Sequence, residues 1–180
     1  MGCLSKLNRA ILVDCDGGAA GIAEMLLINF ADIATKSVDA SSVATITLAS
    51  GAKAVLVESN KKGVNATEEI KQNDNAPTAL TQAVTFTLYQ TGKNSIGAQI
   101  VNQILNGTFI AIVSTKTGAK RMYGLNYGLS LSALTEDLNA NGGFTTITLA
   151  TPENVIGESR IAFGDAAYAT LRNAAIVTES

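Results

Sequence analysis

The sequence predicts a mainly β fold, an antiparallel β-sandwich or barrel with one packed α-helix at about residues 95–106. Short segments of alternating apolar and polar residues recur between turn signals, and only one segment has a clear helical period. The segments follow one another as hairpins, without the repeated strand–helix alternation of a doubly wound sheet. No linker or internal repeat divides the 180 residues, so we expect a single domain over residues 1–180.

The first strands are expected before residue 58. Residues 25–33 are apolar and strand-like, and residues 43–48 alternate between apolar and polar side chains. Ser50 and Gly51 signal a turn, after which residues 52–57 resume as a strand. The segments on either side of this turn are therefore predicted to pair as a hairpin.

A long polar loop is expected over residues 60–77, which are rich in Lys, Asn and Glu, with room for an edge strand at residues 65–70. Loops of this length in compact domains are usually functional. We expect this one to reach a neighbouring subunit. Residues 83–89 then alternate again and predict another strand.

The helix is predicted from an apolar stripe and from its two ends. Asn94 or Ser95 can cap the first amides, and Gly107 occupies the position where a left-handed residue commonly ends a helix. A helix of about three turns is too short to be stable alone, so its stripe must pack on a sheet. The stripe repeats at helical spacing and consists of Ile96, Ile100, Val101, Ile104 and Leu105.

The remaining strands follow the helix. Residues 109–113 form a continuous apolar run, typical of a strand buried on both faces. A tight turn at residues 116–119 leads to a returning strand and then to a second long polar loop. The later segments alternate more weakly, and the tail is compatible with helix or strand. These expectations cover a strand at 121–132, a loop at 134–143, strands at 144–149 and 156–163, and the undecided tail at 166–177.

The low charge of the chain bears on its surroundings. Charged residues make up 16% of the sequence, against roughly 25% in a typical soluble domain. Because a monomer needs a charged surface to stay soluble, we expect neighbouring subunits to cover much of the outside. The net charge of −2 and the lack of a Lys or Arg block argue against a nucleic-acid-binding face.

The chain lacks the residues that most kinds of catalytic site require. There is no histidine, which excludes Ser-His-Asp and Cys-His sets. Cys3 and Cys15 form no CxxC motif and are predicted to be free thiols in a reducing cytosol. No apolar run reaches the length of a membrane span, and no Walker or Rossmann glycine pattern occurs. We therefore expect no catalytic residue, cofactor, metal or membrane binding.

One enzymatic alternative comes from residues 11–18 (ILVDCDGG), an apolar strand followed by Asp-x-Asp-Gly. This resembles the first motif of haloacid-dehalogenase-type phosphatases, in which Asp14 would be the nucleophile and Asp16 the general acid/base, with magnesium between them. Gly164-Asp165 would serve as the later acidic motif, and Lys116 or Lys120 as the lysine. The family usually has Thr where this chain has Gly18, and the hairpins after residue 20 do not suit its fold. The alternative interpretation of residues 14–18 is a structural turn in which Asp and Gly supply the turn geometry.

A further alternative is a β adhesion or carbohydrate-binding module. Aromatic residues make up 5% of the chain and there is no Trp. Sugar platforms need exposed rings, so this composition argues against such a module.

A family resemblance rests on the block between Ser95 and Leu149. Its parts are residues 100–107 (IVNQILNG), 109–113 (FIAIV), 123–129 (YGLNYGL) and 143–149 (GFTTITL). This block resembles the virion structural proteins of phages that infect Bacteroides-type bacteria, which are similar to tail-tube proteins. The strand containing LINFADI, residues 27–33, and the strand at 85–88 fit as well. The resemblance covers residues 1–150 and ends after Leu149, where the family often has TGEE and this chain has Ala150-Thr151-Pro152-Glu153.

The resemblance implies a non-catalytic virion protein, one subunit of a homo-oligomeric ring in a phage tail tube or head–tail connector. The ring would line a channel through which viral DNA passes without sequence-specific binding. Its partners would be further copies of itself and adjacent tail or connector proteins. It would be assembled in the bacterial cytoplasm and located in the virion. The long loops near 60–77 and 134–143 would bridge subunits, and the C-terminal part after Leu149 would be adapted to a different neighbour, such as a connector ring.

Overall fold

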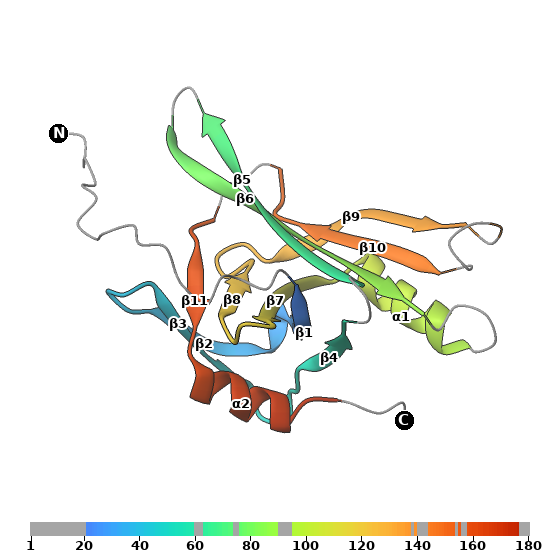
Figure 1. Cartoon of the computed structure of the whole chain (residues 1–180), viewed down its shortest axis with the longest axis horizontal. Helices are drawn as coiled ribbons and strands as arrows, with labels where there is room; N and C mark the ends of the chain where they lie inside the picture. Colours follow the sequence, from blue (N-terminus) through green and yellow to red (C-terminus); the bar gives the residue numbers. More distant parts are fainter. Residues whose placement is uncertain are drawn as a thin grey trace.

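The computed structural model describes residues 21–59, 63–73, 76–89, 95–137, 139, 144–153, 155 and 158–176. Over these residues the prediction of a mainly β fold is confirmed, with eleven strands in one sheet and two α-helices (Figure 1). Neither of these helices is long and apolar enough to cross a membrane. The strands are β1 (Ile22–Asn29), β2 (Ile33–Val38), β3 (Val43–Leu48), β4 (Val55–Glu58), β5 (Val64–Asn73), β6 (Ala76–Leu88), β7 (Thr108–Thr115), β8 (Lys120–Tyr123), β9 (Leu129–Glu136), β10 (Thr145–Ala150) and β11 (Ile161–Phe163).

The centre of the molecule is the antiparallel pair β1–β7. Successive side chains of a strand point to opposite faces, and here both faces are covered. Met25 and Leu27 of β1 belong to one core cluster, whereas Leu26 and Ile28 belong to a second. The six residues from Phe109 to Ser114 in β7 are all buried. The prediction that this apolar run is a strand buried on both faces is therefore confirmed.

The first core cluster is closed by a layer of four strands in the order β9-β10-β6-β5, which is uppermost in Figure 1. This layer contributes Val84, Phe86, Ile147 and Leu149 to the cluster. Helix α1 (Ser95–Leu105) packs Ile104 into the same cluster. The predicted helix is confirmed, and it begins and ends within one residue of the expected positions. Two details of the prediction are wrong: Gly107 does not have the positive φ of a left-handed cap, and Leu105 of the predicted stripe is 50% exposed.

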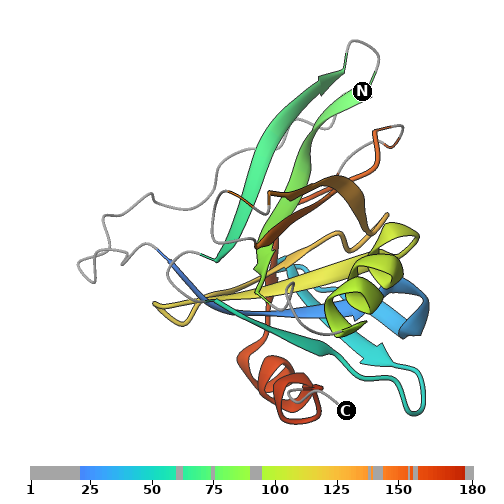
Figure 2. The same cartoon turned by 90° about the vertical axis from the view of Figure 1, so that its right-hand side faces the viewer.

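The second core cluster is closed by β2, β3, β11 and helix α2 (Asp165–Asn173). The C-terminal segment, for which the sequence allowed helix or strand, therefore contains a helix, and Tyr168 of this helix is buried against the cluster. The β11–β3 pair is parallel and the other strand pairs are antiparallel, so the sheet is mixed. Figures 1 and 2 both show the β5–β6 hairpin and α2 at opposite ends of the molecule.

The predicted hairpin between residues 43–48 and 52–57 is wrong. Gly51 does turn, with a φ of 83°, but β3 pairs with β2 and β11, whereas β4 pairs with β1. Ala54 is buried in the second core cluster and directs the chain from one layer to the next. The turn predicted at Gly51 is therefore present, but the strand that follows it pairs with β1 and not with β3.

The predicted loop at 60–77 is also wrong over most of its length, because β5 occupies residues 64–73 and β6 begins at Ala76. The expected edge strand at 65–70 is confirmed and is longer than predicted. Polar residues suit this strand because β5 is a sheet edge with β6 as its only strand partner in the described chain. Its inward Glu68 is paired with Arg160.

Other boundaries shift for identifiable reasons. The strand expected at 25–33 ends at Asn29, and a 3₁₀ turn (Phe30–Asp32) leads into β2. The strand expected at 121–132 is divided into β8 and β9 by a turn in which Gly124 and Gly128 have φ values of 78° and 71°. Within the loop expected at 134–143, the first three residues belong to β9, and residues 138 and 140–143 lie outside the described residues.

Candidate functional site

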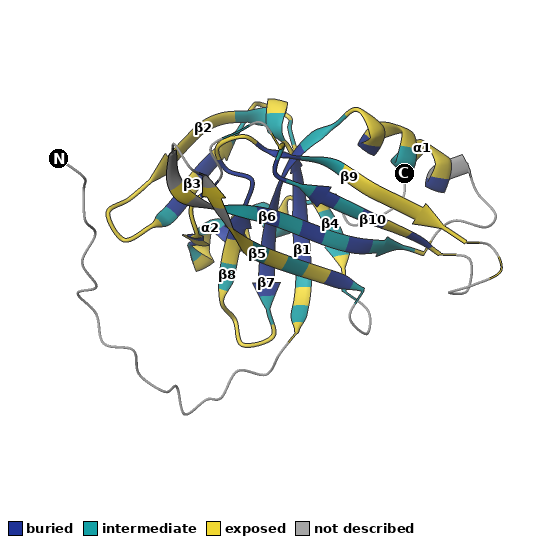
Figure 3. Ribbon diagram, turned by 90° about the horizontal axis from the view of Figure 1, so that it is seen from above, coloured by how far each residue is buried: buried dark blue, intermediate teal, exposed yellow. Residues whose placement is uncertain are grey.

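The outer surface of the β9-β10-β6-β5 layer is rich in threonine. These threonines alternate with the inward residues Val84, Phe86, Ile147 and Leu149 and therefore point away from the core. Figure 3 shows the four strands from above, with exposed and half-exposed positions along each of them. We call this surface the threonine face; it consists of Thr67, Thr81, Thr85, Thr87, Thr135, Thr146 and Thr148.

The threonines stand opposite one another across the strands. Thr146 of β10 pairs with Thr87 of β6 on one side and with Thr135 of β9 on the other. The hydroxyl oxygens of Thr85 and Thr148 are 3.0 Å apart and share a hydrogen bond. Such cross-strand pairs stabilise a sheet, and they leave short, uncharged side chains on its surface.

Charge is sparse on this face. The outward positions of β6, β10 and β9 whose side chains are described carry only Thr, Ala and Ser. Glu69, on the edge strand β5, faces outward opposite Thr81. The outward positions described on β6, β10 and β9 therefore carry no positive charge that would attract a polyanion.

An aromatic pair marks one end of the threonine face. The rings of Tyr89 and Phe144 meet edge to face, with centroids 4.8 Å apart. Both side chains are exposed. Aromatic pairs of this geometry add about 0.5–1.5 kcal/mol beyond the area that they bury, so this contact ties the ends of β6 and β10 together.

The free edge of β5 adjoins the threonine face. The amide of Thr87 donates to the carbonyl of Gly63 (2.9 Å), which marks these two residues as a hydrogen-bonded pair. Because such pairs alternate along an antiparallel ladder, the even-numbered residues Ala66, Glu68 and Ile70 direct their N–H and C=O groups away from β6. Ile70 is 69% exposed. An open edge with an exposed apolar residue is a template for another strand.

A buried glutamine holds the layer onto the rest of the molecule. Gln82 of β6 is 1% exposed. Its amide nitrogen donates to Glu68 (3.2 Å) and to the carbonyl of Ser159 (3.3 Å), and its oxygen accepts from the amide of Gly124 (2.9 Å). Buried polar groups require such partners. The network connects β5, β6 and the turn between β8 and β9.

Glu158 fixes the same turn from the other side. Its carboxylate, buried at 2% exposure, accepts hydrogen bonds from the amides of Asn126 (3.0 Å) and Tyr127 (2.9 Å). Burial raises the pKa of this carboxyl above its ordinary value, while the two amides and the charge of Lys36 oppose the rise. The Lys36 ammonium in turn donates to the carbonyl of Leu125 (2.7 Å).

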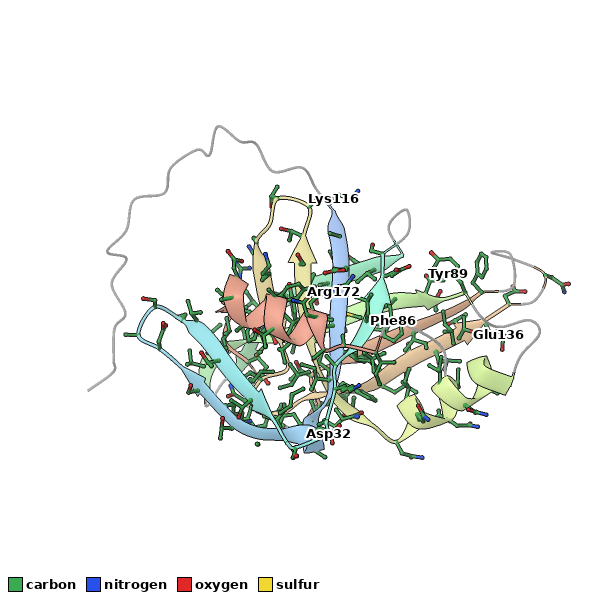
Figure 4. All side chains as sticks on the ribbon, turned by 90° about the horizontal axis from the view of Figure 1, so that it is seen from below. Asp32, Phe86, Tyr89, Lys116, Glu136 and Arg172 are labelled. Atoms are coloured by element: carbon green, nitrogen blue, oxygen red, sulfur yellow. The ribbon has the colours of Figure 1, made fainter. Side chains whose placement is uncertain are left out.

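An apolar groove of about 950 Å³ lies beneath the layer, between α1 and β4. Figure 4, seen from below, places Phe86 between these two elements and Asp32 at one end. Phe86, Ile100 and Ile104 are among the apolar residues that line it, and Lys53 and Glu58 are among the charged ones.

Only some residues of the phosphatase hypothesis lie within the described ranges. Asp14 and Asp16, like Cys3 and Cys15, lie outside the described residues. Lys120 forms an ion pair with Asp165 (2.9 Å), whereas Lys116 lines a separate cavity. No group of three or more Asp, Glu, Cys or His side chains within the described ranges is placed to hold a metal ion.

Comparison with known proteins found no match among protein-family models, curated proteins or solved structures. The candidate site therefore stands on geometry alone. The Thr-x-Thr alternation in β6 and β10 is visible in the sequence. The register that makes these strands neighbours, and the Gln82 and Glu158 contacts, come from the fold.

Proposed function

We propose that this chain is a non-catalytic structural protein of a phage virion, one subunit of a homo-oligomeric ring in a tail tube or head–tail connector. In this proposal the threonine face lines the channel through which DNA passes. The observation that carries it is the uncharged outward surface of β6, β10 and β9. A channel wall of short neutral side chains does not retain a polyanion by counterion release.

The sheet edges support the ring. The continuous path of the sheet begins at β2 and ends at β5, and in the described chain each has one strand partner. A head-to-tail contact between two different surfaces of identical subunits generates a ring when the rotation closes. Pairing of the β5 edge with a strand of the next subunit would extend the threonine face around the channel.

We also propose that the fold is a tail-tube-like β-sandwich. The central strands and the β9-β10-β6-β5 layer enclose the first core cluster, and we take them as the two sheets of a tail-tube-like sandwich. The low charge of the chain, 16% of residues, is the composition expected when neighbouring subunits cover much of the surface.

The test is negative-stain electron microscopy of the purified full chain. We expect rings for the wild type and for the Ile70→Thr variant, which keeps the free amide of β5. The Ile70→Pro variant should remain monomeric, because proline removes an amide that faces the open edge and leaves the ladder with β6 intact. A wild type that stays monomeric at high concentration and is absent from virions would refute the proposal. Rings of Ile70→Pro would refute the role of the β5 edge.

A further inference from the structure

A second cavity, of about 1010 Å³, lies between β5 and the adjoining ends of β1, β7 and β8. Val64 and Ala66, from the inner side of β5, contribute to its lining, so it adjoins the open β5 edge that the proposed ring uses. We call it the basic pocket. Its lining includes Val64, Val113, Tyr123, Lys116 and Arg121.

The floor of the basic pocket is apolar. Val64, Val113 and Tyr123 are each at most 5% exposed and belong to the first core cluster. Burial, with the nearby charge of Glu68, raises the pKa of the Tyr123 hydroxyl, while the charge of Arg121 and a hydrogen bond between the two side chains oppose the rise. Tyr123 therefore keeps its proton at neutral pH and can donate a hydrogen bond at the edge of an otherwise apolar surface.

Two cations stand over this floor. Arg121 pairs in register with Val113 across the β7–β8 hairpin, and it lies two residues before Tyr123, so both side chains are on one face of β8. The amide of Lys116 donates to the carbonyl of Gly21 (3.1 Å), and its side chain crosses that glycine. Figure 4 shows Lys116 beside the start of β1.

The charge of these two cations is not compensated by neighbouring carboxylates. Among the described residues, Lys120, Arg160 and Arg172 each form an ion pair with a carboxylate, whereas Lys116 and Arg121, like Lys36 and Lys53, form none. Glu68, the acidic residue that acts on Tyr123, is already paired with Arg160. The pocket therefore combines a buried apolar floor with two cations that lack an anionic partner within the described chain.

We propose that the basic pocket binds an amphiphilic organic anion, with its carboxylate or phosphate group between Lys116 and Arg121 and its apolar part on the floor. Guanidinium groups bind carboxylate and phosphate through paired hydrogen bonds. The apolar part gains by leaving water. An anion without an apolar part would use only the two cations and would bind more weakly.

The experiment is isothermal titration of the full-length chain with hexanoate, hexyl phosphate and hexylammonium. We expect the two anions to bind with dissociation constants on the order of 1 mM and hexylammonium not to bind. The two anionic probes distinguish a carboxylate ligand from a phosphate ligand. Arg121→Gln and Lys116→Gln should each weaken binding about tenfold. Lys53→Gln, which removes a lysine from the other groove, is the matched control and should leave binding unchanged.

Three outcomes would overturn the assignment: binding of hexylammonium as tight as that of hexanoate, equal weakening by Lys53→Gln, or no saturable binding of either anion. Far-UV circular dichroism of each variant establishes that it is folded. Because both cations are on the surface, two independent variants are available if one fails to fold. Ring formation is not part of the readout, so failure of this proposal is distinguishable from failure of the ring.

Discussion

Gly128, at the end of the turn that joins β8 to β9, is a position where one added methyl group would meet both backbone strain and a close neighbour. Its φ is 71°. A Cβ placed there would lie 2.2 Å from the Cγ2 of Thr108 and 3.1 Å from a ring carbon of Phe30. Gly51 is the matched control, because its φ is 83° and a Cβ there meets no atom within 4 Å.

Backbone strain and overpacking contribute separately to the expected loss of unfolding free energy. Gly51→Ala carries only the left-handed backbone cost, about 1 kcal/mol. Gly128→Ala carries the same cost plus overpacking, for a total loss of unfolding free energy of about 2–4 kcal/mol. Thr108→Ser removes the methyl group that clashes. The double variant Thr108→Ser/Gly128→Ala should therefore recover about 1–2 kcal/mol relative to the sum of the single variants.

The assay is urea denaturation followed by circular dichroism, with the unfolding free energy extrapolated to water. Equal losses for Gly51→Ala and Gly128→Ala would refute the packing argument. Strict additivity of Thr108→Ser and Gly128→Ala would show that the Thr108 methyl group is not the obstacle. Either result would mean that the turn between β8 and β9 is looser than the contacts around Gly128 indicate.

Three further predictions concern other parts of the molecule. Burial raises the folded-state pKa of Glu158 above its ordinary value, so the wild type loses stability as the pH rises from the ordinary glutamate pKa through the folded-state pKa. The Glu158→Gln variant does not titrate in this range. Urea denaturation at several pH values should therefore show Glu158→Gln gaining stability relative to the wild type as the pH rises between these two pKa values. Tyr168→Phe removes the 2.9 Å bond to Glu24 and should cost about 1–2 kcal/mol in the same assay. In rings, Thr146→Lys should create salt-dependent DNA retention in a filter-binding assay, whereas Ser41→Lys, in the turn after β2, should not.

The pattern of apolar residues along the sequence predicted the strands and the helix that pack into the core. The central residues 109–113 of β7 are all apolar because both faces of the strand are covered. In α1, Ile100 and Ile104 of the predicted stripe pack on the sheet. These features follow from local sequence. The predicted β3–β4 hairpin failed because Gly51 specifies a turn without specifying which strand the chain meets after Ala54.

The candidate site was less accessible to sequence reasoning. β5 is polar because one edge and one face meet solvent, and a polar segment of this kind has the composition of a loop. Gln82 and Glu158 are buried by residues far from them in sequence, such as Gly124 and Asn126. No local pattern distinguishes a buried polar residue with distant partners from an exposed one.

The most direct test of the central claim is a cryo-electron-microscopy reconstruction of the assembled ring, either purified or within a virion, at a resolution that traces strands. We expect β6, β10 and β9 to face the central channel, with Thr85 and Thr148 on its wall and β5 at a junction between subunits. A ring in which the threonine face points outward, or is buried between subunits away from the axis, would contradict the proposed function.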